Sequence, residues 1–216
     1  MNTYLKHAAD ISKYVRTNAV GKVRDTGHGM TEHGEASLVS CMDRLLKIAG
    51  HTSPKKSPKA SCFATGEQYK KEWRKVFLTN LYDIIAWRDK GTGEKAVFPN
   101  EDAKLIKQQK KKPIGEGIVL TRGKLVHKET YASALVLKRT NNNPLGVETL
   151  TMYPYLHPEV SKATGKDLYP ILIQTNAWKQ ANEARRKKLL TMITPDHLLL
   201  SEEDLAFSKS EPVIAN

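Results

Sequence analysis

The stretch that decides the fold is GVETLTMYPYLHP, Gly146–Pro158, because its side chains alternate as they do in a β-strand. One set of alternate positions, Leu150 and Met152, is apolar and predicts the face that packs on a core. The other set carries mostly hydroxyl groups: Val147, Thr149, Thr151, Tyr153 and Tyr155. In a basic protein, such a face is either solvated or suited to an anionic ligand.

A second strand is predicted over His127–Arg139, HKETYASALVLKR, and the turn sequence NNNPLG at Asn141–Gly146 joins the two strands. Placing its Leu135 and Leu137 beside the apolar residues of the later strand sets the register. The opposite face then has small residues in its middle, lysines at its ends and hydroxyls across from them: Lys128, Thr130, Ala132, Ala134 and Lys138 with Thr149, Thr151 and Tyr153. We expect a shallow groove with positive walls, or else the solvated outer face of an antiparallel sheet.

The first half of the chain predicts three helices, over Thr3–Arg16, Gly34–Ala49 and Glu67–Asp89. The third has the clearest apolar stripe, with lysines and an arginine outside it. Its predicted core residues are Tyr69, Trp73, Phe77, Leu81, Ile84 and Ile85.

The remaining segments complete an α+β pattern. His51–Ala64 predicts a loop, and a further loop with a short helix ends in a lysine run stopped by Pro113. From Gly115 the period changes to two, which predicts a hairpin turning at Arg122-Gly123. A fourth strand over Leu168–Thr175 and a helix over residues 177–193, capped by Asn176, are expected to follow.

The expected fold class is therefore α+β, with N-terminal helices followed by a mainly antiparallel four-stranded sheet and a C-terminal helix. We expect a single domain over residues 1–216. Within it, residues 1–64 are a possible helical N-terminal extension, and residues 65–195 form the helix-plus-sheet core.

Charge is the most informative bulk property of the chain. The 216 residues carry a formal net charge of +12, and their 39% hydrophobic content indicates a folded chain. Such an excess favours an anionic partner, with nucleic acid first. No window approaches the ~20 apolar residues of a membrane span, the N-terminus lacks a signal-peptide core, and two cysteines are too few for a disulfide scaffold. We therefore expect a cytoplasmic site of action, reduced thiols and no membrane partner.

Two short motifs resemble the BECR superfamily of ribonucleases, which includes barnase, EndoU-type and colicin-type RNases and RelE-like toxins. LTMYP at Leu150–Pro154 is similar to the strand that carries the threonine and aromatic residue of bacterial EndoU-type toxins. The histidine-rich turn GHGMTEHGE at Gly27–Glu35 is similar to segments that supply the acid and base. The resemblance spans about residues 27–155.

This resemblance implies a toxin-type, metal-independent endoribonuclease that needs no cofactor and leaves a 2′,3′-cyclic phosphate. It implies His28 and His33 as general acid and base, in either order, because histidine titrates near neutral pH. Lys128 would stabilise the phosphorane, Thr151 would contact phosphate or base, and Tyr153 would stack on the base or orient the ribose. It also implies an acidic immunity or antitoxin protein as a partner beside RNA.

Two further histidines are weighed against that pair. His51 is separated from His33 by a predicted helix of about 15 residues, roughly 22 Å long, so the two could not share one phosphate. His127 is a reserve candidate, because a one-residue shift of register would turn it onto the groove face.

The main alternative is a non-catalytic nucleic-acid-binding protein that uses its basic helices and the sheet groove. The candidate phosphate contacts are Lys70, Lys71, Arg74, Lys75, Lys110, Lys111, Lys112, Lys138, Arg185 and Arg186. HGE at His33–Glu35 resembles half of a zinc deaminase motif, but the chain has no CxxC to complete it. An ADP-ribosyltransferase would need Glu35 or Glu148 as its acid, without a supporting Ser-Thr-Ser run.

Overall fold

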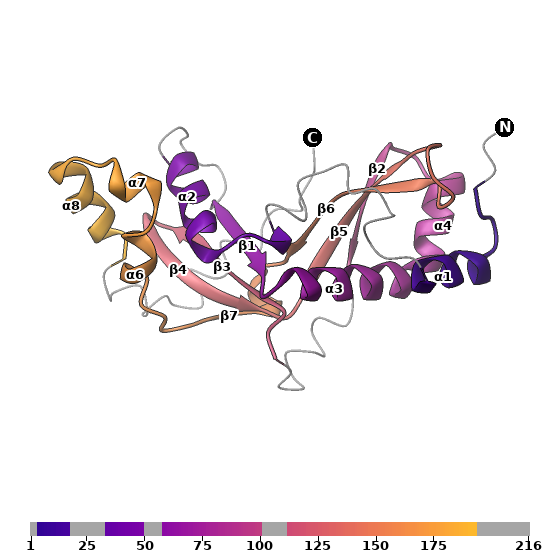
Figure 1. The fold of residues 1–216 in the computed structure, drawn as a ribbon, viewed down its shortest axis with the longest axis horizontal. Helices are drawn as coiled ribbons and strands as arrows, with labels where there is room; N and C mark the ends of the chain where they lie inside the picture. Colours follow the sequence, from indigo (N-terminus) through magenta and orange to yellow (C-terminus); the bar gives the residue numbers. More distant parts are fainter. Residues whose placement is uncertain (1–3, 18–32, 50–57, 101–111, 194–216) are drawn as a thin grey trace.

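Seven antiparallel strands form two sheets that lie next to each other along the long axis of the molecule (Figure 1). The computed structural model describes residues 4–17, 33–49, 58–100 and 112–193. The first sheet has the order β1-β3-β4-β7, with β1 (Lys59–Phe63), β3 (Gly115–Thr121), β4 (Lys124–Thr130) and β7 (Ser161–Ala163). The second has the order β2-β5-β6, with β2 (Lys95–Pro99), β5 (Ser133–Arg139) and β6 (Val147–Pro154). The α+β class is confirmed.

Each sheet has its own helices. The helices on the three-stranded sheet are α1 (Ala8–Thr17), α3 (Gly66–Thr79) and α4 (Leu81–Lys90). The four-stranded sheet is covered by α2 (Leu38–Ala49). Beyond it lie α6 (Tyr169–Leu172), α7 (Asn176–Lys179) and α8 (Glu183–Thr191), at the opposite end from α1 and α4 (Figure 1). A short 3₁₀ turn, η3 (Pro158–Val160), connects β6 to β7.

Two hydrophobic cores hold these layers together. In one, the predicted stripe of α3 and α4 packs against Leu135 and Met152, and Trp73 stacks on Phe77 with ring centroids 5.0 Å apart. In the other, the apolar face of α2 packs against Ile118. The core assignment for the third predicted helix is confirmed, with only Ile85 partly exposed.

The helix predicted over Glu67–Asp89 is divided into α3 and α4 at Asn80. The buried Asn80 side chain donates to the carbonyl of Val76 at 2.9 Å and to that of Pro99 at 3.1 Å. These bonds bend the chain and fix the break to the end of β2. Apolar periodicity continues through Asn80, so it gave no sign of the break.

Two strands lie in segments where the sequence predicted loops, at β1 and β2. The burial of β1 is nearly continuous, so it shows none of the alternation that identifies a half-exposed strand. β1 pairs with β3, so residues 1–64 contribute a strand to the four-stranded sheet. The division of the chain into an extension and a core stays a prediction.

The single strand predicted over His127–Arg139 is wrong, because the chain leaves one sheet and enters the other at Tyr131-Ala132. Residues before this point belong to β4 and those after it to β5. The buried Thr130 hydroxyl donates to the carbonyl of Tyr155 at 2.5 Å, and Tyr155 N donates to the carbonyl of Ala132 at 2.8 Å. These hydrogen bonds join residues that are far apart in the sequence, so the spacing of apolar residues along the chain does not indicate the turn.

The strand predicted over Leu168–Thr175 is also wrong, because this segment forms α6 and a following turn. The last predicted helix is two helices. Thr175, not Asn176, caps α7, with its hydroxyl accepting from Trp178 N at 3.1 Å, and Asn182 caps α8. The predicted turns at Arg122-Gly123 and Asn141–Gly146 are confirmed.

A β-bulge in β6 changes which of its residues face the core. Val136 pairs with Thr151, but Leu137 pairs with Thr149, so Leu150 is the extra residue. Thr149 therefore turns into the core, where its hydroxyl accepts a hydrogen bond from Trp73 Nε1 at 2.9 Å. The expectation that Thr149 lies on the groove face is wrong for this reason.

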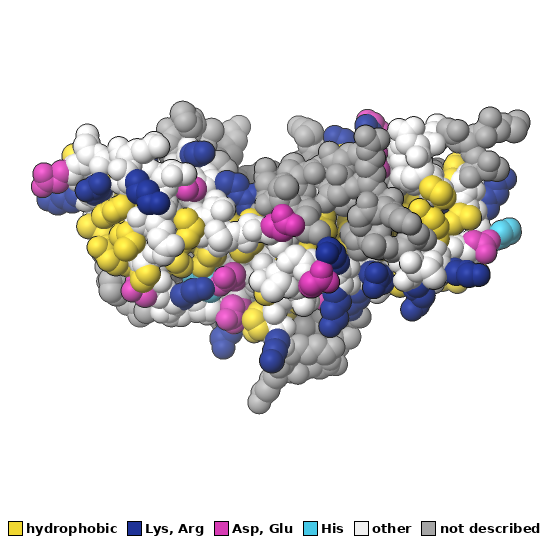
Figure 2. All heavy atoms as spheres, viewed as in Figure 1, with side chains coloured by type: hydrophobic (Ala, Val, Ile, Leu, Met, Phe, Trp, Pro, Cys, Tyr) yellow, Lys and Arg dark blue, Asp and Glu magenta, His cyan; other side chains and the backbone are white. Residues whose placement is uncertain are grey.

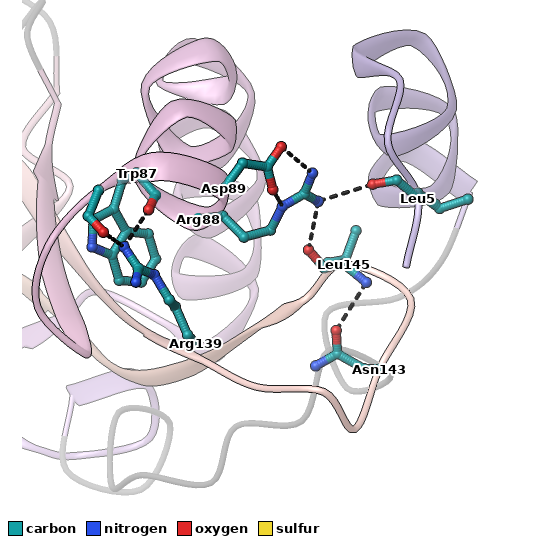
Figure 3. Close-up of polar contacts among 8 residues, drawn as sticks. Leu5, Trp87, Arg88, Asp89, Arg139, Asn143 and Leu145 are labelled. Atoms are coloured by element: carbon teal, nitrogen blue, oxygen red, sulfur yellow. Dashed lines mark hydrogen bonds and ion pairs between the residues drawn. The ribbon is translucent and has the colours of Figure 1, made fainter. Parts of the chain in front are cut away.

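Two arginines fasten the end of the molecule that carries α1 and α4 (Figure 3). The buried Arg88 donates from Nη1 to the carbonyls of Leu5 and Leu145, at 2.9 and 3.0 Å, and also pairs with Asp89. Arg139 donates to carbonyls at the C-terminal end of α4. The bonds around Leu5 hold the first described residues against the β5–β6 loop, so α1 begins at Ala8, later than the expected start.

The two sheets come into close contact where the end of β6 and the residue Leu156 after it lie against β3. A Cβ atom at Gly117 would lie 2.5 Å from the carbonyl oxygen of Ala60 and 2.7 Å from Leu156 Cδ1. A Cβ atom at Gly115 would lie 2.5 Å from the carbonyl oxygen of Cys62 and 2.9 Å from a ring atom of the proline that ends β6. Only glycine allows this approach.

We expect Gly117→Ala to lower the free energy of unfolding by about 1–3 kcal/mol, because the added methyl group overpacks the crossing of β6 and β3. Urea denaturation measures the change. Gly165→Ala is the matched control, since a Cβ there meets nothing within 4 Å. Equal stability of the two variants would contradict the close approach.

Candidate functional site

Ser61 of β1 joins the two parts of the candidate site. Its carbonyl oxygen lies 2.7 Å from His33 Nδ1 and 3.5 Å from Arg44 Nη2. Its hydroxyl donates to the carbonyl of Pro154, the last residue of β6, at 2.8 Å. One buried residue therefore places a histidine and an arginine from the α2 side beside the end of β6.

The hydrogen bond to Ser61 defines the tautomer of His33. A carbonyl oxygen only accepts, so His33 Nδ1 must carry the proton and donate. The other ring nitrogen, Nε2, is then an acceptor when the ring is neutral and a donor when it is protonated. His33 lies four residues before Ser37, whose Oγ accepts from Ser40 N at 3.2 Å and caps α2.

Tyr153 extends from β6 toward this histidine, and Thr151 lies two residues earlier on the same face of the strand. The rings of Tyr153 and His33 have centroids 5.9 Å apart and are tilted by 48°. Burial raises the pKa of Tyr153, so its hydroxyl stays protonated and remains a donor. Thr151 Oγ1 is buried and, among the described residues, has no hydrogen-bond partner. A buried hydroxyl of this kind can donate to a ligand without first breaking a hydrogen bond within the described residues.

Arg44 is a candidate site residue that the sequence did not indicate. It lies on α2 among the buried residues Cys41 and Leu45 and is itself half-buried. Its Nη2 also lies 3.6 Å from Cys41 Sγ. A guanidinium in this setting is a strong candidate for binding phosphate, because its planar donors match phosphate oxygens. The sequence feature that could have indicated it is a basic residue next to the apolar face of the helix predicted over Gly34–Ala49.

Cys41 and Cys62 are free thiols buried beneath Arg44. A hydrogen bond between the two thiols, together with Arg44, lowers the pKa of Cys41. The same bond and burial raise the pKa of Cys62. This contact ties α2 to β1, which are the two elements that carry Arg44 and Ser61.

The structure brings two of the five predicted catalytic residues together, His33 and Tyr153, and Thr151 lies on the same face of β6 as Tyr153. Lys128 is buried in β4, where it pairs with Gly117 and Ala163, and Gly117 pairs in turn with Ser61 of β1. It was placed on the groove face by the single-strand prediction, which the turn between β4 and β5 overturns. His28 and the rejected His51 lie outside the described residues.

The predicted phosphate contacts do not form one surface. The lysines and arginines of α3 lie on a different part of the molecule from Arg185 and Arg186 of α8 (Figure 1), and basic side chains are spread along the face shown in Figure 2. Lys70 pairs with Glu67 at 2.7 Å, and Lys138 pairs with Glu94 at 3.1 Å. The positions on α3 and before β3 are Lys70, Lys71, Arg74, Lys75 and Lys112, while Lys110 and Lys111 lie outside the described residues.

His127, the reserve candidate, belongs to a separate polar cluster on the four-stranded sheet. Its Nε2 donates to Glu116 Oε2 at 2.8 Å, and its Nδ1 lies 2.5 Å from Thr164 Oγ1. Lys166 Nζ lies 2.8 Å from the same carboxylate oxygen. The His127 hydrogen bond and Lys166 lower the pKa of Glu116 to about 2. The cluster fastens the segment around β7 to β3 and β4, so His127 has a structural role here.

Within the described ranges, no three His, Cys, Asp or Glu side chains are grouped to hold a metal ion. None of the helices in the same ranges has the length and apolar composition of a membrane span.

No family model and no curated protein matches the chain. Its fold is similar to a chain in the crystal structure of a CdiA-CT/CdiI complex from Y. kristensenii 33638, with 16% sequence identity and a TM-score of 0.47. The similarity covers 60% of this chain and 99% of that chain. A likeness of this size is a partial overlap of folds and assigns no function.

The Glu116 cluster predicts a specific pH dependence of stability. Because the pKa of Glu116 is lowered from 4.5 to about 2 on folding, its contribution is complete above its unfolded value and is lost as the pH falls toward about 2. Glu116→Gln should therefore lose less free energy of unfolding than the wild type over this pH range. Urea denaturation at several pH values measures both profiles. Lys166→Met, which removes one partner, should be intermediate, and parallel profiles for all three would contradict the assignment.

Proposed function

We propose that the chain is a metal-independent endoribonuclease whose site is formed by His33, Arg44, Thr151 and Tyr153. The observation that carries this proposal is the convergence of His33 and Arg44 on the carbonyl of Ser61, next to the end of β6. A proton-transfer group, a guanidinium and two hydroxyls thereby come from separate parts of the chain to one place. Cleavage of RNA by its own 2′-hydroxyl needs proton transfer and stabilisation of the charge on the phosphorane, and these groups can supply both.

His33 is the proton-transfer group in this proposal. With Nδ1 held by Ser61, Nε2 is directed away from that bond and can take the proton of the ribose 2′-hydroxyl or protonate the leaving 5′-oxygen. A histidine fixed in one tautomer by a backbone carbonyl is oriented for transfer through a single nitrogen. His28 remains the proposed second histidine of the acid–base pair.

In this proposal Arg44 stabilises the phosphorane, which is the role that the family resemblance implied for Lys128. Its guanidinium would stabilise the charge that develops on the phosphorane, and its half-buried position strengthens that interaction relative to bulk water. The Thr151 hydroxyl, which lacks a partner among the described residues, would donate to a phosphate oxygen. The protonated Tyr153 hydroxyl would orient the ribose, or its ring would stack on the base.

We propose further that the ribonuclease is a toxin with an acidic immunity or antitoxin partner. A net charge of +12 complements an acidic protein as well as RNA. An uncontrolled ribonuclease of this kind would damage the cell that makes it, and a partner that covers the site would prevent this damage.

The deciding experiment incubates the purified chain with total cellular RNA in EDTA. We expect fragments that end in 2′,3′-cyclic phosphate. His33→Ala should reduce the rate by roughly 10²- to 10⁴-fold, because proton-transfer catalysis is lost. Arg44→Ala and Thr151→Ala should reduce it on the order of 10²-fold, through lost stabilisation of the transition state. Mass spectrometry of the fragment ends and gel electrophoresis measure both outcomes.

Arg16→Ala is the matched control for Arg44→Ala, since it removes an exposed guanidinium from α1, at the opposite end of the molecule from α2 (Figure 1). Its activity should equal that of the wild type. Cleavage that persists in His33→Ala and Arg44→Ala would place the activity elsewhere. Intact RNA that is nevertheless shifted on a gel at low salt would favour the non-catalytic nucleic-acid-binding protein instead.

The toxin proposal predicts the effect of the chain on a growing host. Induced expression of the wild type should arrest growth, while His33→Ala, which lacks the proton-transfer group, should be tolerated at the same protein level. Growth curves with immunoblots measure this difference. High-yield purification of the active wild-type chain alone from a growing host would contradict it.

A further inference from the structure

A row of rings continues from the candidate site along the chain after β6. Tyr153, Tyr155 and His157 occupy alternate positions of an extended segment, with centroids 6.5 Å apart for the first pair and 5.6 Å for the second. The alternating residues Pro154 and Leu156 are buried on the other side. The row begins at His33, whose ring lies 5.9 Å from that of Tyr153.

The middle of this row has the features of a stacking surface. Tyr155 and His157 lie nearly parallel, with 17° between their planes, and both remain half-buried. Lys59 Nζ lies 5.6 Å from the centroid of the Tyr155 ring, so a cation accompanies the aromatic surface. Burial raises the pKa of Tyr155, which keeps the ring uncharged and suited to stacking.

The row ends at Glu159. Its carboxylate lies 3.9 Å from His157 Nδ1, and His157 Nδ1 accepts from Glu159 N at 3.3 Å. These contacts fix the orientation of the last ring. A carboxylate at this point would repel a phosphate, so the surface that favours a nucleotide chain runs from His33 to His157 and stops there.

We propose that the Tyr153–Tyr155–His157 row binds successive bases of a single-stranded RNA, beside the phosphate that is cleaved. This inference rests on the proposed function and specifies its substrate as single-stranded RNA that extends beyond the cleaved dinucleotide. Aromatic rings accept any base by stacking, and a nearby lysine contacts the backbone. A duplex is a poor ligand, because its bases are already stacked within the helix.

The length of the substrate provides the test. Tyr155→Ala should leave the kcat/KM for a mixture of dinucleotides unchanged, because a dinucleotide at the His33 site does not reach Tyr155. For a single-stranded RNA of about ten nucleotides, kcat/KM should fall roughly 5- to 150-fold, the loss of one stacked base. Tyr155→Trp, which keeps an aromatic surface, should retain activity on both substrates.

Tyr82→Ala is the matched control, because it removes a tyrosine that is 77% exposed on α4, away from the row. Equal losses on dinucleotides and on the longer RNA would overturn the inference, since the row would then support only the folded site. No loss on either substrate would also overturn it and leave the row as packing or as a protein contact.

A binding measurement separates this inference from the proposed function. If the wild type cleaves no RNA, fluorescence anisotropy with labelled single-stranded RNA still reports on the row. Weaker binding by Tyr155→Ala than by Tyr82→Ala would support the row although the ribonuclease proposal had failed. Equal affinities would overturn the row. Annealing the RNA to its complement should weaken binding to the wild type, and equal binding of duplex and single strand would count against stacking.

Discussion

The close approach of β6 to β3 is the contact on which the candidate site depends. Two glycines, Gly115 and Gly117, leave room for Pro154 and Leu156 to lie directly on the strand. Any larger residue would push the end of β6 away from the four-stranded sheet. Because α2 and its arginine are packed on that sheet and the hydroxyl residues belong to β6, this spacing decides whether the two sets of side chains meet.

Ser61 converts this packing into a defined geometry. Its hydroxyl donates a hydrogen bond to the carbonyl of Pro154 in β6, and its own carbonyl accepts hydrogen bonds from His33 and Arg44. A single residue therefore fixes both groups relative to β6 through short-range bonds in a largely buried setting. Groups held in this way need little rearrangement when charge develops on a substrate, which is the condition for effective electrostatic catalysis. The two cores on either side give the frame its rigidity.

The sequence predicted the parts of this site that depend on local patterns. Alternation placed Thr151 and Tyr153 on one face of a strand, and Tyr153 lies beside His33. Alternation failed for Thr149, because a β-bulge at Leu150 shifts the register and no residue in the sequence indicates that bulge. It failed to place Lys128 and Thr151 in different sheets, because the change of sheet after β4 depends on hydrogen bonds of Thr130 with residues far along the chain. Helix and core assignments succeeded where apolar periodicity was long, and boundaries set by single polar side chains were missed.

Arg44 shows why the choice of cation could not be made from the sequence. Among 35 lysines and arginines, the relevant one is distinguished by its partial burial and by its neighbours across the fold, not by clustering. The clusters that charge analysis selects, on α3 and α8, lie on separate parts of an elongated molecule (Figure 1). At physiological salt, charges separated by more than about 8 Å are largely screened, so these clusters cannot all act on one phosphate. In the proposed ribonuclease, their combined field would raise the rate at which an anionic chain arrives, and the half-buried guanidinium would act at the phosphate that is cleaved.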